Sequence, residues 1–104
     1  MAQRVGKEEL AKLLAEPQPV LVDFYTDSCI ACKQMSPVLG DLEDAYAGKA
    51  KVVKVNAAFD TELAEKYAVM AAPTLVFFKD QAEVQRFQGV VPKETLQQVF
   101  DTLV

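Results

Sequence analysis

VLVDFYTDSCIAC, residues 20–32, leads from an apolar run into Cys29 and Cys32, which are the only two cysteines of the 104-residue chain. The first six residues are apolar on both faces except at Asp23, a pattern typical of a central strand in a parallel sheet. The segment that follows, 32–48, has apolar residues at helical spacing. The chain therefore predicts a buried strand, a short loop with two thiols, and a helix.

The spacing of the two thiols points to a redox site. Two residues separate Cys29 from Cys32, which places the sulfurs one helical turn apart and close enough to form a disulfide. Cys29 lies where the helix begins, and the unpaired backbone N–H groups and the dipole of that end favour a thiolate. A thiolate beside a second thiol is what disulfide exchange requires.

Other uses of two cysteines fit less well. A structural zinc site needs four ligands, and the chain offers two cysteines and no histidine. Zinc or an iron–sulfur cluster would then need a dimer or help from carboxylates. A permanent disulfide across so short a loop would restrict the unfolded chain very little. Redox activity without a metal or cofactor is the favoured interpretation.

Composition and charge narrow the function classes. The length suits one domain, residues 1–104. A net charge of −4 without a basic stripe argues against nucleic-acid binding. The start of the chain lacks the apolar core of a signal peptide, and no apolar run reaches membrane-spanning length. We expect a monomer in the cytoplasm, where a lone cysteine pair is more often catalytic than structural.

Apolar periodicity and turn residues predict the remaining elements. Helices are expected over Lys7–Ala15, from Asp60 as cap to about Tyr67, and after Pro92, and strands over Lys51–Val55, Thr74–Phe78 and Glu83–Phe87. Residues 2–5 are a candidate extra edge strand. Strands separated by helices indicate a parallel βαβ unit, and the last two strands form a hairpin. The fold class is α/β, with a mixed sheet of four to five strands and helices on both faces.

Particular side chains have predicted places. A lone carboxylate in an apolar strand is costly, so Asp23 should have a partner or a raised pKa. This favours a general base and acid for Cys32 over an edge position in solvent. Gly48 is expected to cap the helix after the cysteines. The phenylalanines are expected in or near the core: Phe24, Phe59, Phe77, Phe78, Phe87 and Phe100.

The chain resembles the thioredoxin family from about Lys7 to Leu103. The shared motifs are Val22-Asp23-Phe24, Cys29-x-x-Cys32-Lys33 with Pro37, Lys54-Val55-Asn56, Ala72-Pro73-Thr74, and Gly89 after the hairpin. Together they are far more specific than a cysteine pair alone. The resemblance implies a thioredoxin fold and a thiol-disulfide oxidoreductase that reduces protein disulfides.

The resemblance also implies catalytic roles. Cys29 matches the exposed nucleophile, and Cys32 matches the buried resolving thiol. Asp23 matches a buried carboxylate beneath the resolving thiol, and Lys54 matches its lysine partner.

Four further residues match the rim that receives substrate, and they are Ala72, Pro73, Gly89 and Val90. The family has a cis peptide bond before the proline, which faces the disulfide. Such a bond would leave the Ala72 N–H and C=O free to pair with an extended substrate.

The candidate active site departs from the family pattern. Trp-Cys-Gly-Pro-Cys is usual, whereas this chain has Ser28, Ile30 and Ala31 before and between its cysteines and no tryptophan anywhere. These changes predict an altered redox potential and its own choice of partner, with Ile30 and Ala31 offering apolar contacts to substrate. Ser28 is expected either to cap the helix or to contact the Cys29 sulfur. The hairpin also lacks the family's Asn-Gly or Asp-Gly turn.

The expected partners are protein disulfides and a thioredoxin reductase or an equivalent electron donor. One alternative is a glutaredoxin-like, glutathione-dependent reductase, although such chains usually carry a tyrosine between the cysteines. A second is a binding module with the thioredoxin fold and no turnover. Two intact cysteines with Asp23 behind them argue against that module.

Overall fold

The computed structural model describes residues 2–104. In chain order its elements are β1 (Gln3–Arg4), α1 (Lys7–Ala15), β2 (Val20–Tyr25), α2 (Ile30–Ala45), β3 (Lys51–Asn56), α3 (Thr61–Lys66), β4 (Thr74–Lys79), β5 (Ala82–Gln88) and α4 (Lys93–Leu103). The edge strand expected within residues 2–5 is therefore present as β1.

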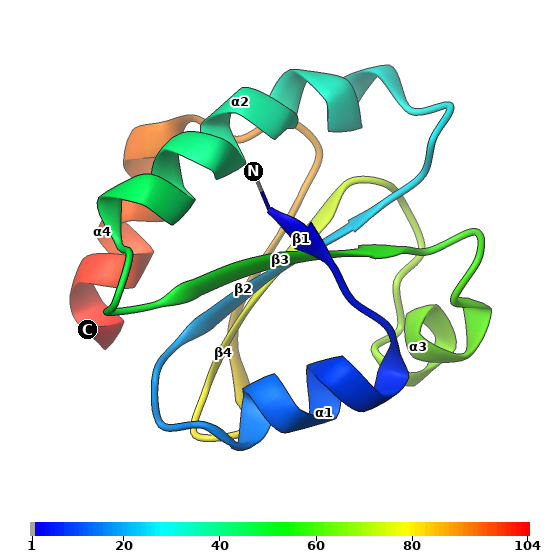
Figure 1. Ribbon diagram of the computed structural model, residues 1–104. Helices are drawn as coiled ribbons and strands as arrows, with labels where there is room; N and C mark the ends of the chain where they lie inside the picture. Colours follow the sequence, from blue (N-terminus) through cyan, green and yellow to red (C-terminus); the bar gives the residue numbers. More distant parts are fainter. Residues whose placement is uncertain (1) are drawn as a thin grey trace.

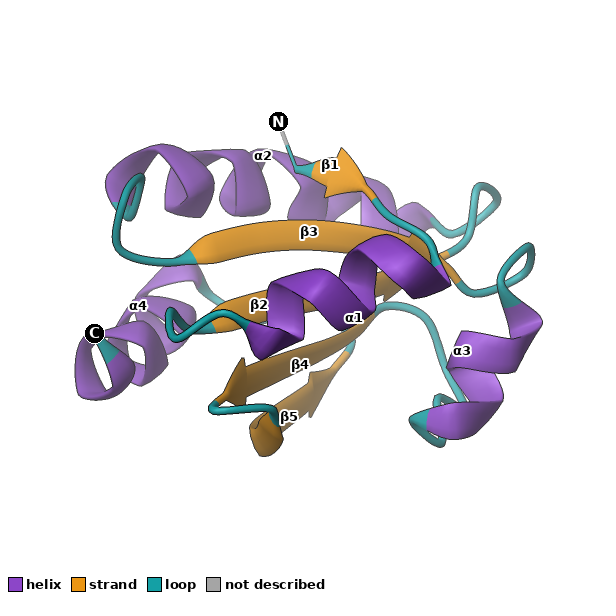
Figure 2. Cartoon of the chain, turned by 60° about the horizontal axis from the view of Figure 1, so that its bottom comes forward, coloured by secondary structure: helices purple, strands orange, loops and turns teal. Residues whose placement is uncertain are grey.

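The strands form one sheet in the order β1-β3-β2-β4-β5. β1, β3 and β2 are parallel, whereas β4 runs antiparallel to both of its neighbours. Helices α2 and α4 cover one face of the sheet, and α1 and α3 cover the other (Figure 1, Figure 2). The α/β class, the mixed sheet and the helices on both faces are confirmed.

Alternation of side chains along β2 divides the core into two clusters. Val20, Val22 and Phe24 pack with residues of α1 and α3. Leu21 packs on the other face, with residues of α2 and α4. By the same alternation Asp23 faces α2, the helix that follows the first cysteine.

Helix α2 differs from the prediction at both ends. It begins at Ile30 and ends at Ala45, with Tyr46 as its C-cap. Tyr46 is buried, and its ring centroid lies 4.8 Å from that of Phe100, so the chain leaves the helix where this ring packs against α4. Gly48 is not the cap and lies in the turn beyond it. Its φ of 81° is a conformation that glycine adopts without steric cost.

One prediction about the loop between β3 and α3 is wrong, and a second is confirmed only in part. Phe59 is 74% exposed instead of packing in the core, and the Arg4 guanidinium lies 4.8 Å from its ring centroid. Asp60 occupies the N-cap of α3, but its side chain makes no capping hydrogen bond. Asn56 orders this loop instead, because its Oδ1 accepts from the backbone N–H of Ala58 over 3.0 Å.

The β4–β5 hairpin is tight although it lacks glycine in its turn. Asp80 and Gln81 both have positive φ, 53° and 68°. Positive φ at both central residues is the geometry of the two-residue turn that matches strand twist. The missing Asn-Gly or Asp-Gly pair therefore changes the residues of the turn and leaves its shape intact.

Candidate active site

Cys29 and Cys32 are joined by a disulfide at the N-terminal end of α2, with their Cα atoms 5.2 Å apart. Cys29 is the N-cap residue, and the backbone N–H of Cys32 donates to its Sγ over 3.0 Å. A donor at this position stabilises negative charge on the sulfur. Cys32 is only 6% exposed, whereas Cys29 is half-buried. The more accessible sulfur is therefore the one at the end of the helix.

Ser28 does not cap α2, because Cys29 occupies the N-cap and its sulfur accepts the free N–H. Ser28 is exposed beside the disulfide. In the first turn of α2, Ala31 is half-buried and Ile30 is 74% exposed. The exposed Ile30 side chain is accessible to a partner, and its apolar contact with substrate stays a prediction.

Asp23 and Lys54 lie side by side on adjacent strands, because β2 and β3 pair Asp23 with Lys54 in register. Asp23 is 3% exposed, and its Oδ1 has no hydrogen-bond partner among the described residues. Burial raises the pKa of Asp23 from 3.8 to about 7, and the positive charge of Lys54 opposes this rise only in part. The Lys54 Nζ lies 5.0 Å from the centroid of the Tyr25 ring. The burial and the raised pKa expected for Asp23 are both present.

A cavity of about 160 Å³ connects this carboxyl with the disulfide. Asp23, Cys32 and Lys54 line it, together with Lys33 and Ser36, which are exposed. The cavity therefore reaches the surface and is polar enough to hold water. A carboxyl with a pKa near neutrality can exchange a proton with the Cys32 thiol across such a space.

The loop before β4 lies against the first cysteine. The Ala72–Pro73 peptide bond is cis, as the resemblance implied, and the Ala72 carbonyl oxygen lies 3.5 Å from Cys29 Sγ. The N–H of Gly89 donates to the Pro73 carbonyl over 2.9 Å. Gly89 has a φ of 83°, a conformation suited to glycine, and Val90 after it is 56% exposed. The structure thus joins the two loops that contain the predicted rim residues and places Ala72 beside Cys29.

Sequence reasoning missed Met70, which is 87% exposed in the same loop. Met70 and Ala72 belong to the lining of a pocket of about 230 Å³, together with Thr26, Ala57 and Ala58 on neighbouring segments. A signal was available in the sequence. Residues 69–72 form an apolar run, VMAA, that belongs to neither a predicted strand nor a predicted helix.

Two other features, a cluster of metal ligands and a membrane-spanning helix, are absent from residues 2–104. Within that range no group of three or more histidine, cysteine, aspartate or glutamate side chains has an arrangement that could hold a metal ion. No helix in the same range combines the length and apolarity needed to cross a bilayer.

Comparison with known proteins gives the family. A family model described as thioredoxin matches residues 2–102. The chain belongs to the thioredoxin family. Thioredoxin 1 of Nostoc sp. is 39% identical over 90 residues, which are 86% of this chain and 84% of the relative. A thioredoxin of Staphylococcus aureus is 43% identical over 81 residues, 78% of each chain. A mutant thioredoxin from Halobacterium salinarum has a TM-score of 0.89 and 31% identity, and the match covers 98% of this chain and 89% of that one.

This membership establishes the general activity. The protein is a thiol-disulfide oxidoreductase that acts on protein disulfides, and Cys29 and Cys32 form its redox-active pair. The recognition of the family, the fold and the function predicted from the sequence are confirmed. The family has protein disulfides as substrates and a reductase as electron donor. Neither the glutathione-dependent alternative nor the binding-module alternative gains support.

Proposed function

We propose a two-step exchange in which Cys29 attacks and Cys32 resolves. The Cys29 thiolate attacks one sulfur of a substrate disulfide, which forms a mixed disulfide and releases the other substrate sulfur as a thiolate. The Cys32 thiolate then attacks Cys29 Sγ, so that the substrate leaves with its second sulfur reduced. Two electrons pass from the protein dithiol to the substrate, and the Cys29–Cys32 disulfide forms.

One observation carries this assignment of roles. Cys29 is the N-cap of α2, where its sulfur accepts the N–H of Cys32 over 3.0 Å, and it is the more exposed of the pair. Cys32 is buried and lines the cavity that contains Asp23. An accessible sulfur with a backbone donor suits the attacking thiolate, and a buried one suits the later intramolecular step.

Asp23 accepts the proton of Cys32 in this mechanism and returns a proton when the disulfide is reduced again. Support comes from its pKa of about 7, because a base works best when its pKa lies near the operating pH. Lys54 lies beside it in register and favours the ionised carboxylate that the proton transfer requires.

The substrate segment docks on a rim made by Ile30, Ala31, Ala72, Pro73 and Val90, with Ser28 at its margin. Gly89 positions this rim through its hydrogen bond to the Pro73 carbonyl. The Ala72 backbone lies beside Cys29 Sγ, so a disulfide held in extended form along it would reach the attacking sulfur. The exposed side chains of Ile30 and Val90 give the rim apolar character.

The proposal also includes the cellular setting in which the protein acts. The chain acts as a single monomeric domain in the cytoplasm, where it contributes to electron transport and redox homeostasis away from membranes and nucleic acid. A thioredoxin reductase or an equivalent donor returns the Cys29–Cys32 disulfide to the dithiol.

Alkylation of the reduced protein tests the roles of the two thiols. Iodoacetamide should modify Cys29 much faster than Cys32, because Cys32 is buried and Cys29 has the N–H donor. Peptide mass mapping measures both rates. Equal labelling, or faster labelling of Cys32, would reverse the assignment.

Turnover of insulin disulfides tests the electron donor. We expect reduction when NADPH and a thioredoxin reductase are supplied, and little reduction when glutathione and glutathione reductase replace them. Turnover with glutathione alone would support the glutaredoxin-like alternative. Binding of insulin without reduction by the dithiol form would support a binding module.

A further inference from the structure

A β-bulge in β5 places two opposite charges on the same face of the sheet. The β4–β5 register shifts between Phe77 and Phe78, which leaves Val84 as an extra residue in β5. Side chains three positions apart in a regular strand point to opposite faces, so Glu83 and Arg86 would be separated by the sheet. The extra residue returns them to one face, the face covered by α1 and α3, on which Phe78 packs.

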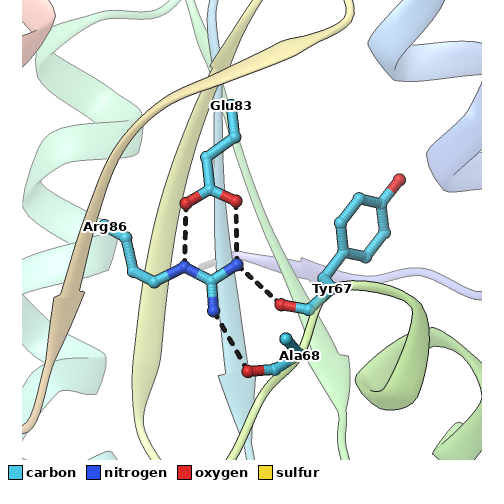
Figure 3. Close-up of polar contacts among 4 residues, drawn as sticks. All are labelled: Tyr67, Ala68, Glu83 and Arg86. Atoms are coloured by element: carbon cyan, nitrogen blue, oxygen red, sulfur yellow. Dashed lines mark hydrogen bonds and ion pairs between the residues drawn. The ribbon is translucent and has the colours of Figure 1, made fainter.

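The Arg86 guanidinium uses this position to join β5 to the end of α3 (Figure 3). Its Nε and Nη2 each donate to the Glu83 carboxylate over 2.8 Å. Nη2 also donates to the Tyr67 carbonyl over 2.6 Å, and Nη1 to the Ala68 carbonyl over 3.3 Å. These carbonyls follow the last turn of α3, where backbone acceptors lack helical partners. Glu83 therefore orients the Arg86 guanidinium, whose remaining N–H donors bind the carbonyls of Tyr67 and Ala68.

The loop that follows is fixed to β5 at both of its ends. Arg86 holds the upstream end at Tyr67 and Ala68, and Ala68 has a positive φ of 53°. The N–H of Gly89, just after β5, holds the downstream end through the Pro73 carbonyl over 2.9 Å. The upstream attachment is a charged side chain, so a substitution can remove it without changing the backbone.

Between these two attachments the loop is largely exposed, and it carries the backbone beside the redox pair. Met70 is 87% exposed and Ala71 is also exposed, so packing in the core does not hold this part of the loop. The Ala72 carbonyl nevertheless lies 3.5 Å from Cys29 Sγ. Contacts at the two ends of the loop therefore set the position of Ala72, together with the hydrogen bond that Thr74 Oγ1 donates to the Ala71 carbonyl over 2.6 Å.

We propose that Arg86 is a positioning residue for protein substrates: it fixes the upstream end of the α3–β4 loop and so holds the Ala72 backbone where an extended substrate segment pairs with it beside Cys29. The inference rests on the function proposed above and extends it to a residue outside the site. Arg86 acts only through the loop. A small disulfide that needs no loop contacts should therefore react equally well without it.

The geometry requires arginine at this position. A guanidinium has five N–H donors in a rigid plane, so it can bind a carboxylate with one edge and two carbonyls with the others. Lysine keeps the charge but offers one compact ammonium, which cannot bind all three partners at once. Arg86→Lys should therefore keep part of the positioning of the α3–β4 loop, and Arg86→Met should lose it.

The test compares reduced wild-type protein with Arg86→Met, Arg86→Lys and Glu83→Gln in single-turnover reactions. Each is mixed with increasing insulin, which gives a half-saturating concentration and a limiting rate, and separately with the small disulfide DTNB. Lys79→Met is the matched control, because Lys79 donates to the Pro17 carbonyl over 3.1 Å and the substitution removes one charge and one contact of the same kind elsewhere. Circular dichroism verifies folding.

We expect Arg86→Met to raise the half-saturating insulin concentration about fivefold, within the range usual for coupling through a packed loop. The limiting rate and the DTNB rate should stay unchanged. Arg86→Lys and Glu83→Gln should show smaller increases, and Lys79→Met none.

Three results would overturn the proposal: unchanged insulin saturation in Arg86→Met, equal slowing with insulin and DTNB, or the same shift in Lys79→Met. Wild-type protein that leaves insulin oxidised would instead refute the proposed function, and the wild-type trace alone identifies that case.

Discussion

The two faces of β2 differ in function: one packs into an apolar core, and the other carries the buried carboxyl of Asp23. Val20, Val22 and Phe24 face α1 and α3, and each is 1% exposed or less in a wholly apolar cluster. The opposite face begins with Leu21 in an equally dry core, but its next residue is Asp23. There the strand borders the cavity that Cys32 and Lys54 also line.

The difference separates stability from chemistry. Each large apolar side chain buried on the α1–α3 face stabilises the fold by about 1.5–3 kcal/mol. A carboxyl buried without a hydrogen bond to its Oδ1 lowers stability instead, and its raised pKa reports that cost. Substitutions on the first face should therefore alter stability with little change in mechanism, and substitutions on the second should alter both.

The largest effect is expected at the cysteines themselves. Cys29→Ser should abolish insulin reduction, because the serine hydroxyl cannot form the mixed disulfide. Cys32→Ser should instead retain the first step and accumulate a mixed disulfide at Cys29, since the resolving thiol is gone. Non-reducing electrophoresis with mass mapping detects that adduct. An adduct on Cys32 in the Cys29→Ser variant would show that either thiol can attack the substrate.

Next comes the apolar face. Phe24→Ala should lower the free energy of unfolding by about 3–5 kcal/mol, because the ring is completely buried and its loss leaves a cavity. Urea unfolding measures this. Phe59→Ala is the matched control, and as Phe59 is 74% exposed, the same truncation should change stability by less than about 0.5 kcal/mol. Equal losses in the two variants would refute the assigned cores.

Asp23→Asn should remove a dependence of stability on pH. In the wild type the unfolded chain loses the Asp23 proton near pH 4, and the folded protein loses it near pH 7. Between these values only the folded state holds the proton, so stability falls as pH rises and levels off above pH 7. The total fall is on the order of 4 kcal/mol, from about three pH units at about 1.4 kcal/mol each.

The oxidised forms are compared by urea unfolding at pH 4.5, 6 and 8. The free energy of unfolding of Asp23→Asn should exceed that of the wild type by an amount that grows from pH 4.5 to pH 8. Asp80 is exposed, so Asp80→Asn should give no such trend. Insulin turnover should fall in Asp23→Asn, because the amide accepts no proton from Cys32. Parallel stability curves would place the Asp23 carboxyl in solvent.

The smallest effect is expected on the surface between the cysteines. Ile30→Gln should leave stability within about 0.5 kcal/mol, since Ile30 is 74% exposed. It should raise the KM for insulin about threefold, equivalent to about 0.7 kcal/mol of lost contact. Val104→Gln, at another exposed apolar position, is the control. A KM unchanged by Ile30→Gln would remove Ile30 from the docking rim.

The local sequence pattern and the family motifs predicted much of the site around Asp23. The apolar run around Asp23 predicted a central strand, and the structure then showed which helices cover the face on which Asp23 lies. Lys54 could be placed beside it from the motif shared with the family. The cis bond before Pro73 came from the resemblance alone, because proline in a strand start is compatible with either isomer.

Other features depend on contacts that no local pattern contains. Ser28 was a candidate for the helix cap, but Cys29 occupies the N-cap and its sulfur accepts the N–H of Cys32. Phe59 looked like a core residue by type, but it falls in a loop. The Arg86 contacts require a bulge in β5 and the end of α3, which are distant in sequence.

The position of the cavity beside Asp23 affects the order of events during turnover. None of its lining residues belongs to the proposed docking rim, which is made by Ile30, Ala31, Ala72, Pro73 and Val90. Protons therefore reach Asp23 by a route that is separate from the surface on which the partner docks. While a substrate is tethered to Cys29, the carboxyl keeps its own contact with solvent, and the second thiol can be deprotonated before the partner departs. In the proposed mechanism, Cys32 can therefore attack Cys29 and release the reduced partner without prior opening of the complex.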